Sequence, residues 1–116
     1  MAQIGFMVAK IIIEDLTDSN FGDRIAHAKK LLIVEFWDPW CGICAEMAPV
    51  YEGLAEKCSE SATFARLNMR DNKASPDSHQ VYVTPSFIFF RDGKEAGRTG
   101  GLIEPEALEE EFKKYF

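Results

Sequence analysis

The sequence predicts an α/β fold, because short runs with the character of β-strands alternate with segments of helical periodicity. The clearest strand is Leu31–Trp37, which is apolar at nearly every position, as expected for a strand covered by helices on both faces. From Cys44 to Cys58 the apolar side chains recur at helical spacing. The 116 residues, 47% of them hydrophobic, can bury a core without metal or disulfide support. We therefore expect one domain over residues 1–116, with residues 1–9 as a loose arm.

The first half of the chain offers two strands and two helices in alternation. Residues 11–13 are three isoleucines and form a short strand candidate. Residues 17–19 can cap a helix that we expect over residues 20–30. The apolar strand follows, and then a helix that begins at Cys41. Pro49 lies inside this helix and should kink it, because proline removes a backbone hydrogen bond.

The second half continues the alternation and then changes to a hairpin. Residues 62–69 form the next strand candidate, and residues 71–80 an irregular or short helical crossover interrupted by a proline. Residues 86–90 and 95–98 are separated by an Asp-Gly pair that suits a tight turn, so they predict a hairpin. Pro105 then opens a final helix.

The charge balance excludes several classes of function. Nineteen acidic against thirteen basic residues give a net charge of −6, which argues against binding nucleic acid or an anionic membrane through a basic patch. No run is long enough to span a membrane, and the start of the chain lacks the pattern of a signal segment. Three cysteines, one of them unpaired by count, fit a reducing compartment. We expect a cytoplasmic monomer that binds neither nucleic acid nor membrane.

The most informative motif is the pair Cys41 and Cys44, which follows the predicted central strand. If a helix begins at Cys41, the sulfur of this residue faces unpaired backbone N–H groups and the positive end of the helix dipole, which favour the thiolate. We therefore expect Cys41 to be the nucleophile. Cys44, one helical turn later, is close enough to bond to the first sulfur and is interpreted as the resolving thiol.

The same cysteine spacing also begins many zinc sites, which need four ligands. The other candidates, Cys58, His27 and His79, form no second pair with ligand spacing, so we expect no metal. A structural disulfide is also disfavoured, because closing so short a loop stabilises weakly. His27 and His79 are interpreted as solvated surface groups. Cys58 is interpreted as a small buried hydrophobe, with a regulatory thiol as the alternative.

Four separated segments together resemble the thioredoxin family, and they are residues 36–44, 48–49, 83–86, and 90–94 followed by Gly101. Their order and spacing match the family, and the resemblance runs from about residue 11 to the C-terminus. It implies the thioredoxin fold, a central mixed β-sheet flanked by helices on both faces. It also implies that the two thiols form a redox-active disulfide, Cys41–Cys44, with no other cofactor.

The resemblance also assigns the substrate-binding surface. Pro85 matches the family's cis-proline beside the disulfide, and the residue before it, Thr84, would pair its backbone with an extended substrate segment. Read without the family, Pro85 could be a simple strand-boundary residue. Gly101 matches the glycine that leaves room for the substrate chain. The rim of the binding surface would be formed by Trp40, Gly42 and Ile43.

Three positions depart from the family pattern. Ile43 stands where thioredoxins usually carry proline and where oxidising relatives usually carry histidine. Isoleucine offers no charge or hydrogen bond to a thiolate, so the couple should stay on the reducing side. Arg70 replaces the usual acidic residue after the third strand and changes the surface charge. Glu35 stands at the position where thioredoxins carry a buried aspartate.

Glu35 is a candidate catalytic residue outside the cysteine motif. An acid within the most apolar strand should be desolvated, which raises its pKa and suits it to exchange a proton near neutral pH. It could deprotonate Cys44. The alternative is a buried ion pair with Arg66 on the neighbouring strand.

These observations predict a thioredoxin-type enzyme that reduces protein disulfides by dithiol exchange. Its partners would be disulfide-containing proteins and, by resemblance, a thioredoxin reductase as electron donor. The closest rival is an oxidase or isomerase of the disulfide isomerase type, which Glu35 favours and Ile43 opposes. A glutathione-dependent, glutaredoxin-like enzyme is a second rival, disfavoured by the tryptophan pair of residues 37 and 40. A third is a binding module, which an intact thiol pair beside Pro85 disfavours.

Overall fold

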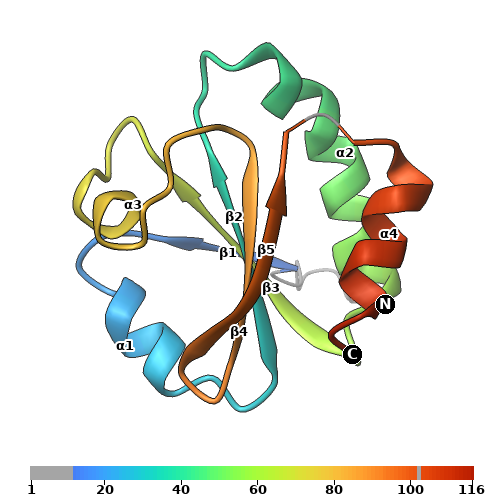
Figure 1. The fold of residues 1–116 in the computed structure, drawn as a ribbon, viewed down its shortest axis with the longest axis horizontal. Helices are drawn as coiled ribbons and strands as arrows, with labels where there is room; N and C mark the ends of the chain where they lie inside the picture. Colours follow the sequence, from blue (N-terminus) through green and yellow to red (C-terminus); the bar gives the residue numbers. More distant parts are fainter. Residues whose placement is uncertain (1–11, 102) are drawn as a thin grey trace, which may run out of the picture.

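A computed structural model of the protein describes residues 12–101 and 103–116 (Figure 1). Within these residues the chain alternates strands and helices and ends with a hairpin and a helix. The elements are β1 (Ile13–Leu16), α1 (Phe21–Ala26), β2 (Leu31–Trp37), α2 (Gly42–Lys57), β3 (Ala62–Asn68), α3 (Ala74–Ser78), β4 (Ser86–Arg91), β5 (Lys94–Gly100) and α4 (Pro105–Lys113). The predicted loose arm, residues 1–9, lies outside the described residues.

The strands form one mixed sheet in the order β1-β3-β2-β4-β5. Strands β1, β3 and β2 pair in parallel, whereas β4 is antiparallel to both β2 and β5. Strand β2 is therefore central, and it is buried at every position except its last residue, Trp37. Parallel and antiparallel pairs in one sheet agree with the predicted α/β fold with a central mixed sheet.

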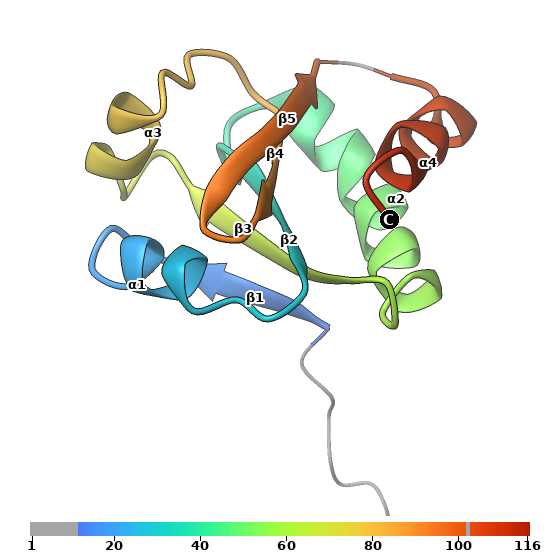
Figure 2. The ribbon, with the colours of Figure 1, turned by 60° about the horizontal axis from the view of Figure 1, so that its bottom comes forward.

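Helices cover both faces of the sheet (Figure 2). On one face, α2 and α4 bury Tyr51 and Phe112 against aromatic residues of β3 and β4. On the other face, α1 buries Phe21 and Ile25 against alternate residues of β2 and β4. Figures 1 and 2 show α3 on the same side as α1, beside the ends of the strands. Residues of β2 pack in both cores, and this packing fixes the position from which the segment after β2 starts.

The beginning of the chain differs from the sequence prediction. Strand β1 begins at Ile13 and runs through acidic residues, whereas the prediction placed a strand at residues 11–13, of which residue 11 lies outside the described part. Its bounds are set by parallel pairing with β3, a partner about 50 residues away. Helix α1 ends at Ala26, four residues early, and His27 is its C-cap, with the backbone outside the helical conformation (φ −109°, ψ 10°).

The predicted cap at residues 17–19 is also wrong, because the N-cap of α1 is Asn20 and its side chain makes no cap bond. Asp18 instead accepts the N–H groups of Ala74 and Ser75, at 3.0 and 2.8 Å, and so caps α3. Pro76 does not interrupt α3, because it lies in the first turn, where backbone N–H groups have no helical partner. Helix α2 runs without interruption through Pro49.

The later elements agree closely with the sequence prediction. The hairpin turn is formed by Asp92 and Gly93, both with positive φ, 54° and 79°, as a tight two-residue turn requires. Pro105 occupies the start of α4. In the described part of the chain, no helix is both long and apolar enough to cross a membrane.

Candidate active site

The cysteine pair lies where the central strand β2 passes into α2. Asp38 organises this connection, since its carbonyl accepts the Cys41 N–H at 3.0 Å and its carboxylate accepts the Trp40 N–H at 2.8 Å. Cys41 is the N-cap of α2, and the helix begins one residue later than predicted, at Gly42. The tight turn thus places Cys41 at the N-terminus of α2, just beyond the C-terminal end of the central strand.

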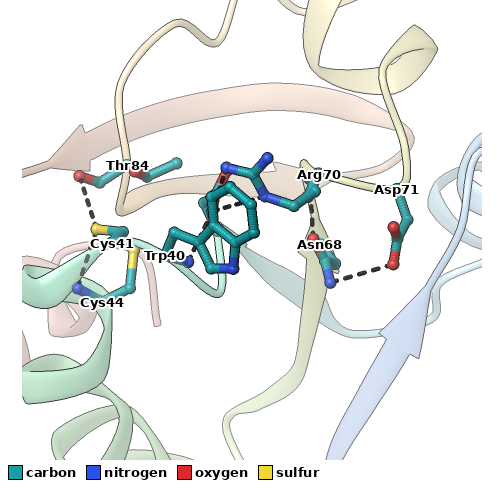
Figure 3. Close-up of polar contacts among 8 residues, drawn as sticks. Trp40, Cys41, Cys44, Asn68, Arg70, Asp71 and Thr84 are labelled. Carbon is teal, nitrogen blue, oxygen red and sulfur yellow. Dashed lines mark hydrogen bonds and ion pairs between the residues drawn. The ribbon is translucent and has the colours of Figure 1, made fainter.

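The Cys41 sulfur lies among groups that stabilise its thiolate (Figure 3). It accepts the backbone N–H of Cys44 at 3.1 Å, and the thiol form donates to the Thr84 carbonyl at 3.7 Å. Burial alone would raise the pKa of Cys41, but hydrogen bonds from the Cys44 thiol and from the first backbone N–H groups of α2 outweigh it and lower this pKa. Cys41 as a residue is half-buried.

The second thiol has the opposite character. Cys44 is buried, and desolvation together with its hydrogen bond to Cys41 raises its pKa to about 11. Both residues are free thiols in this structure. The site therefore holds one thiol biased toward the reactive thiolate and one held as the neutral thiol directly behind it.

A loop from another part of the chain closes the site. The Thr84–Pro85 peptide bond is cis, as the resemblance implies, and Pro85 is buried. The Ser86 hydroxyl donates to the Val83 carbonyl at 2.7 Å and fixes the loop. Thr84 is thus presented directly to Cys41.

Two consecutive glycines support this loop, and they differ in role. A Cβ on Gly100 would lie 2.8 Å from the Pro85 carbonyl oxygen, so only glycine fits there without a shift. Gly101, the residue expected to leave room for substrate, has φ of +79° and faces open space, and its N–H donates to the same carbonyl at 2.8 Å. Sequence reasoning missed Gly100, because the contact is visible only once β5 is placed beside the loop.

Glu35 lies on β2 beneath the thiols and is only 4% exposed. Burial raises its pKa to about 7, an effect that the charge of Arg66 opposes and the charge of Glu52 reinforces. A cavity of about 110 Å³ is lined by Glu35, Cys41 and Cys44 together, so the acid and both cysteines border the same space. That volume has room for water.

The alternative expectation, an ion pair between Glu35 and Arg66, is wrong for the described residues. The two residues are opposite each other on β2 and β3, but the Arg66 Nε–H donates to Asp15 at 2.7 Å. The Arg66 guanidinium is thus held by Asp15 of the edge strand β1, although Arg66 also lines the cavity that contains Glu35. Glu35 is left as a buried acid without that partner.

Large apolar side chains are exposed around the thiols. Trp40 is 79% exposed, Tyr82 74%, Val83 63% and Ile43 36%. A hollow of about 650 Å³ between α3 and the Thr84 loop is lined in part by Tyr82 and Thr84. Exposed apolar groups gathered at one place are typical of a surface that binds another protein. Gly42 is also exposed, and a Cβ there would meet nothing, so Trp40, Gly42 and Ile43 are all accessible beside the thiols.

Sequence reasoning missed Tyr82 and Val83 as parts of this surface. Their position directly before Thr84 in the sequence could have indicated that they belong to it.

The two histidines considered in the sequence analysis lie away from the site. His27 is exposed as expected, but His79 is half-buried, with its ring edge-on to Phe21 and Phe90. The expectation of a solvated His79 is thus wrong.

Cys58 is buried, as expected, and burial raises its pKa. Across residues 12–101 and 103–116, no group of three or more histidine, cysteine or acidic side chains is arranged to hold a metal ion.

Two neighbouring thiols whose pKa values are shifted in opposite directions can exchange a dithiol for a disulfide, and this chemistry defines the class of thiol–disulfide oxidoreductases. Comparison with known proteins identifies the family. The family model described as Thioredoxin matches residues 12–114. The chain belongs to the thioredoxin family.

Individual relatives agree with this assignment. A thioredoxin from Staphylococcus saprophyticus is 35% identical over 103 residues, which are 89% of this chain and 97% of that protein. A thioredoxin from Alicyclobacillus acidocaldarius is 37% identical over 94 residues, 81% of this chain and 89% of that protein. A thioredoxin from Porphyra purpurea is 26% identical, over 89% of this chain and 96% of that protein.

Proposed function

We propose that the protein reduces disulfides of other proteins by dithiol exchange through Cys41 and Cys44. The observation that carries this proposal is the hydrogen bond of 3.1 Å from the Cys44 N–H to the Cys41 sulfur, beside the exposed apolar rim. It favours the thiolate at the less buried cysteine of the pair.

In the first step, the Cys41 thiolate attacks one sulfur of the substrate disulfide. The substrate S–S bond breaks, a Cys41–substrate disulfide forms, and the departing substrate sulfur takes a proton from solvent. The Thr84 backbone and the rim of Trp40, Gly42 and Ile43 hold the substrate segment across the sulfur, and the open space at Gly101 admits it. Protein substrates fit this surface because it is exposed and apolar.

In the second step, Cys44 loses its proton and attacks the Cys41 sulfur. The mixed disulfide breaks, the departing substrate sulfur takes a proton from solvent so that the substrate leaves as a dithiol, and two electrons have passed from the cysteine pair to the substrate. We assign Glu35 as the group that takes the Cys44 proton, through water in the shared cavity. Its raised pKa, about 7, suits a base at neutral pH.

The oxidised Cys41–Cys44 disulfide must then be reduced by an electron donor, for which a thioredoxin reductase is our proposal. The disulfide is the only redox group that this mechanism needs, with no metal or bound cofactor. We also propose that the protein acts as a cytoplasmic monomer of one domain, without binding nucleic acid or membrane.

Insulin reduction with dithiothreitol as electron donor tests the proposal. The protein should accelerate precipitation of the insulin B chain, and a Cys41→Ser, Cys44→Ser double variant should not. The reduction potential of the couple, measured against a thioredoxin of known potential, separates a reductase from an oxidase or isomerase. A couple near −270 mV is expected for a reductase, whereas about −180 mV or higher would support the disulfide isomerase alternative.

A further inference from the structure

Arg70 packs against the rim of the active site, although it lies after the end of β3 and 29 positions beyond the first thiol. Its guanidinium carbon lies 3.7 Å from the centre of the Trp40 ring, which is stacking distance. Figure 3 shows the indole between the two thiols on one side and Arg70 on the other. One face of this highly exposed side chain is thus covered by a planar cation.

Asp38 fixes the guanidinium in this position. Its carboxylate accepts hydrogen bonds from Arg70 Nε and Nη2 at 3.2 to 3.3 Å. The same carboxylate accepts the Trp40 N–H, and the Asp38 carbonyl accepts the Cys41 N–H. Arg70, Trp40 and the turn that presents Cys41 are therefore joined through one residue.

We propose that Arg70 is a positioning residue for the reaction with protein disulfides. It holds the Trp40 indole in one orientation beside Cys41. The proposal rests on the function proposed above and adds a residue that decides which disulfides react well. Arg70 does not contact the sulfurs, so the thiol chemistry itself should not depend on it.

The physical basis is the entropy of ordering a mobile side chain. A tryptophan with most of its surface in water samples several rotamers, and binding a protein on one of them requires the others to be given up. Arginine suits the task because its planar guanidinium can stack on the ring and bond a carboxylate in the same plane. An indole already held in place removes the ordering penalty for a large substrate that packs against it. A small disulfide that reaches Cys41 without contacting the indole does not bind better when the indole is held in place.

The test compares Arg70→Gln with a matched control, Arg24→Gln. The Arg24 side chain is 31% exposed against 40% for Arg70, and it pairs with Glu14 through two hydrogen bonds of 2.7 and 2.8 Å, but it lies on α1, away from the thiols. Each variant is assayed with insulin and with hydroxyethyl disulfide, an uncharged small substrate. The mobility of the indole is read from the {1H}–15N NOE of Trp40 Nε1, and urea melts check folding.

We expect Arg70→Gln to raise the KM for insulin about two- to tenfold with kcat little changed, and to leave hydroxyethyl disulfide reduction unchanged. The NOE of Trp40 Nε1 should fall in Arg70→Gln and stay the same in Arg24→Gln. Arg70→Lys, which keeps the charge without the planar stack, should recover only part of the KM.

The proposal is overturned if the indole NOE is unchanged, if both substrates are affected equally, if Arg24→Gln gives the same change, or if lysine restores the KM fully. If the proposed function is wrong, the result is different: the protein without any substitution does not reduce insulin. In that case the indole mobility still reports on the role of Arg70.

Discussion

The backbone N–H of Cys44 points at the sulfur of Cys41 across 3.1 Å, so the second cysteine stabilises the thiolate of the first. The same residue then carries the thiol that the mechanism uses to resolve the mixed disulfide. The pKa of Cys41 is lowered and that of Cys44 is raised to about 11, so Cys41 is the thiol that attacks first and Cys44, one helical turn later, attacks second.

The first prediction concerns stability and Glu35. Its carboxyl has a pKa of about 7 when folded against 4.5 when exposed, so the folded protein keeps a proton that the unfolded chain releases between these values. Stability should therefore fall as pH rises from about 4.5 to about 7, by about 3 kcal/mol at about 1.4 kcal/mol per pH unit. Glu35→Gln should remove this slope and be the more stable protein at pH 8.

Urea melts between pH 4.5 and pH 8 measure this effect. Glu46→Gln, the same change at an exposed site on α2, should alter stability by less than about 0.5 kcal/mol. An unchanged slope in Glu35→Gln would show that another group titrates, and the assignment of Glu35 as a buried acid would be wrong.

The second prediction separates the two steps of the reaction. Glu35→Gln cannot accept the Cys44 proton, so release of substrate from the mixed disulfide should slow by about a hundredfold near pH 7, the low end for loss of a general base. The first attack by Cys41 should change much less. Rapid-quench single-turnover kinetics measure both rates, and equal slowing of both would argue against a role for Glu35 in activating Cys44.

The third prediction concerns the redox poise set by Ile43. This residue follows Gly42 in the first turn of α2, where a histidine cation could stabilise the thiolate and isoleucine cannot. Ile43→His should raise the reduction potential, by about 30 mV for each 1.4 kcal/mol of thiolate stabilisation, and Ile43→Pro should lower it. Equilibration with glutathione measures both. A histidine variant no more oxidising than the parent would remove the reason for placing this couple among reductases.

The fourth prediction tests the support of the cis-proline loop. Gly100→Ala places a Cβ against the Pro85 carbonyl, and backbone must move to admit it, so we expect a loss of about 1–3 kcal/mol and weaker insulin reduction. Gly53→Ala, on an open face of α2, should instead stabilise by about 0.5–1 kcal/mol. Chemical denaturation compares the two. Equal effects would show that the close approach at Gly100 has no consequence.

Much of the fold could be predicted from the sequence where burial and local geometry agree. Strand β2 was predicted to the residue, because helices cover both its faces and leave an unbroken apolar run. The hairpin was predicted because Asp92 and Gly93 suit positive φ. Strand β1 and the end of α1 were misplaced, since the pairing of β1 with β3 is long-range and invisible to local patterns.

The same distinction holds at the site. The positions of Cys41, Cys44 and Pro85 followed from motifs, because a helix start or a residue before a strand can be read locally. The stacking of Arg70 on Trp40 could not be predicted, since it depends on the fold bringing the end of β3 beside the turn before α2. The pairing of Arg66 with Asp15 was missed for the same reason.

The central claim is that Cys41 attacks and Cys44 resolves, and trapping on a protein disulfide tests it most directly. Each single variant is mixed with oxidised insulin, and covalent complexes are mapped by mass spectrometry without reducing agent. The claim predicts that Cys44→Ser accumulates a mixed disulfide through Cys41, whereas Cys41→Ser forms none and does not reduce insulin. Accumulation through Cys44 in the Cys41→Ser protein, with none through Cys41 in the Cys44→Ser protein, would contradict it.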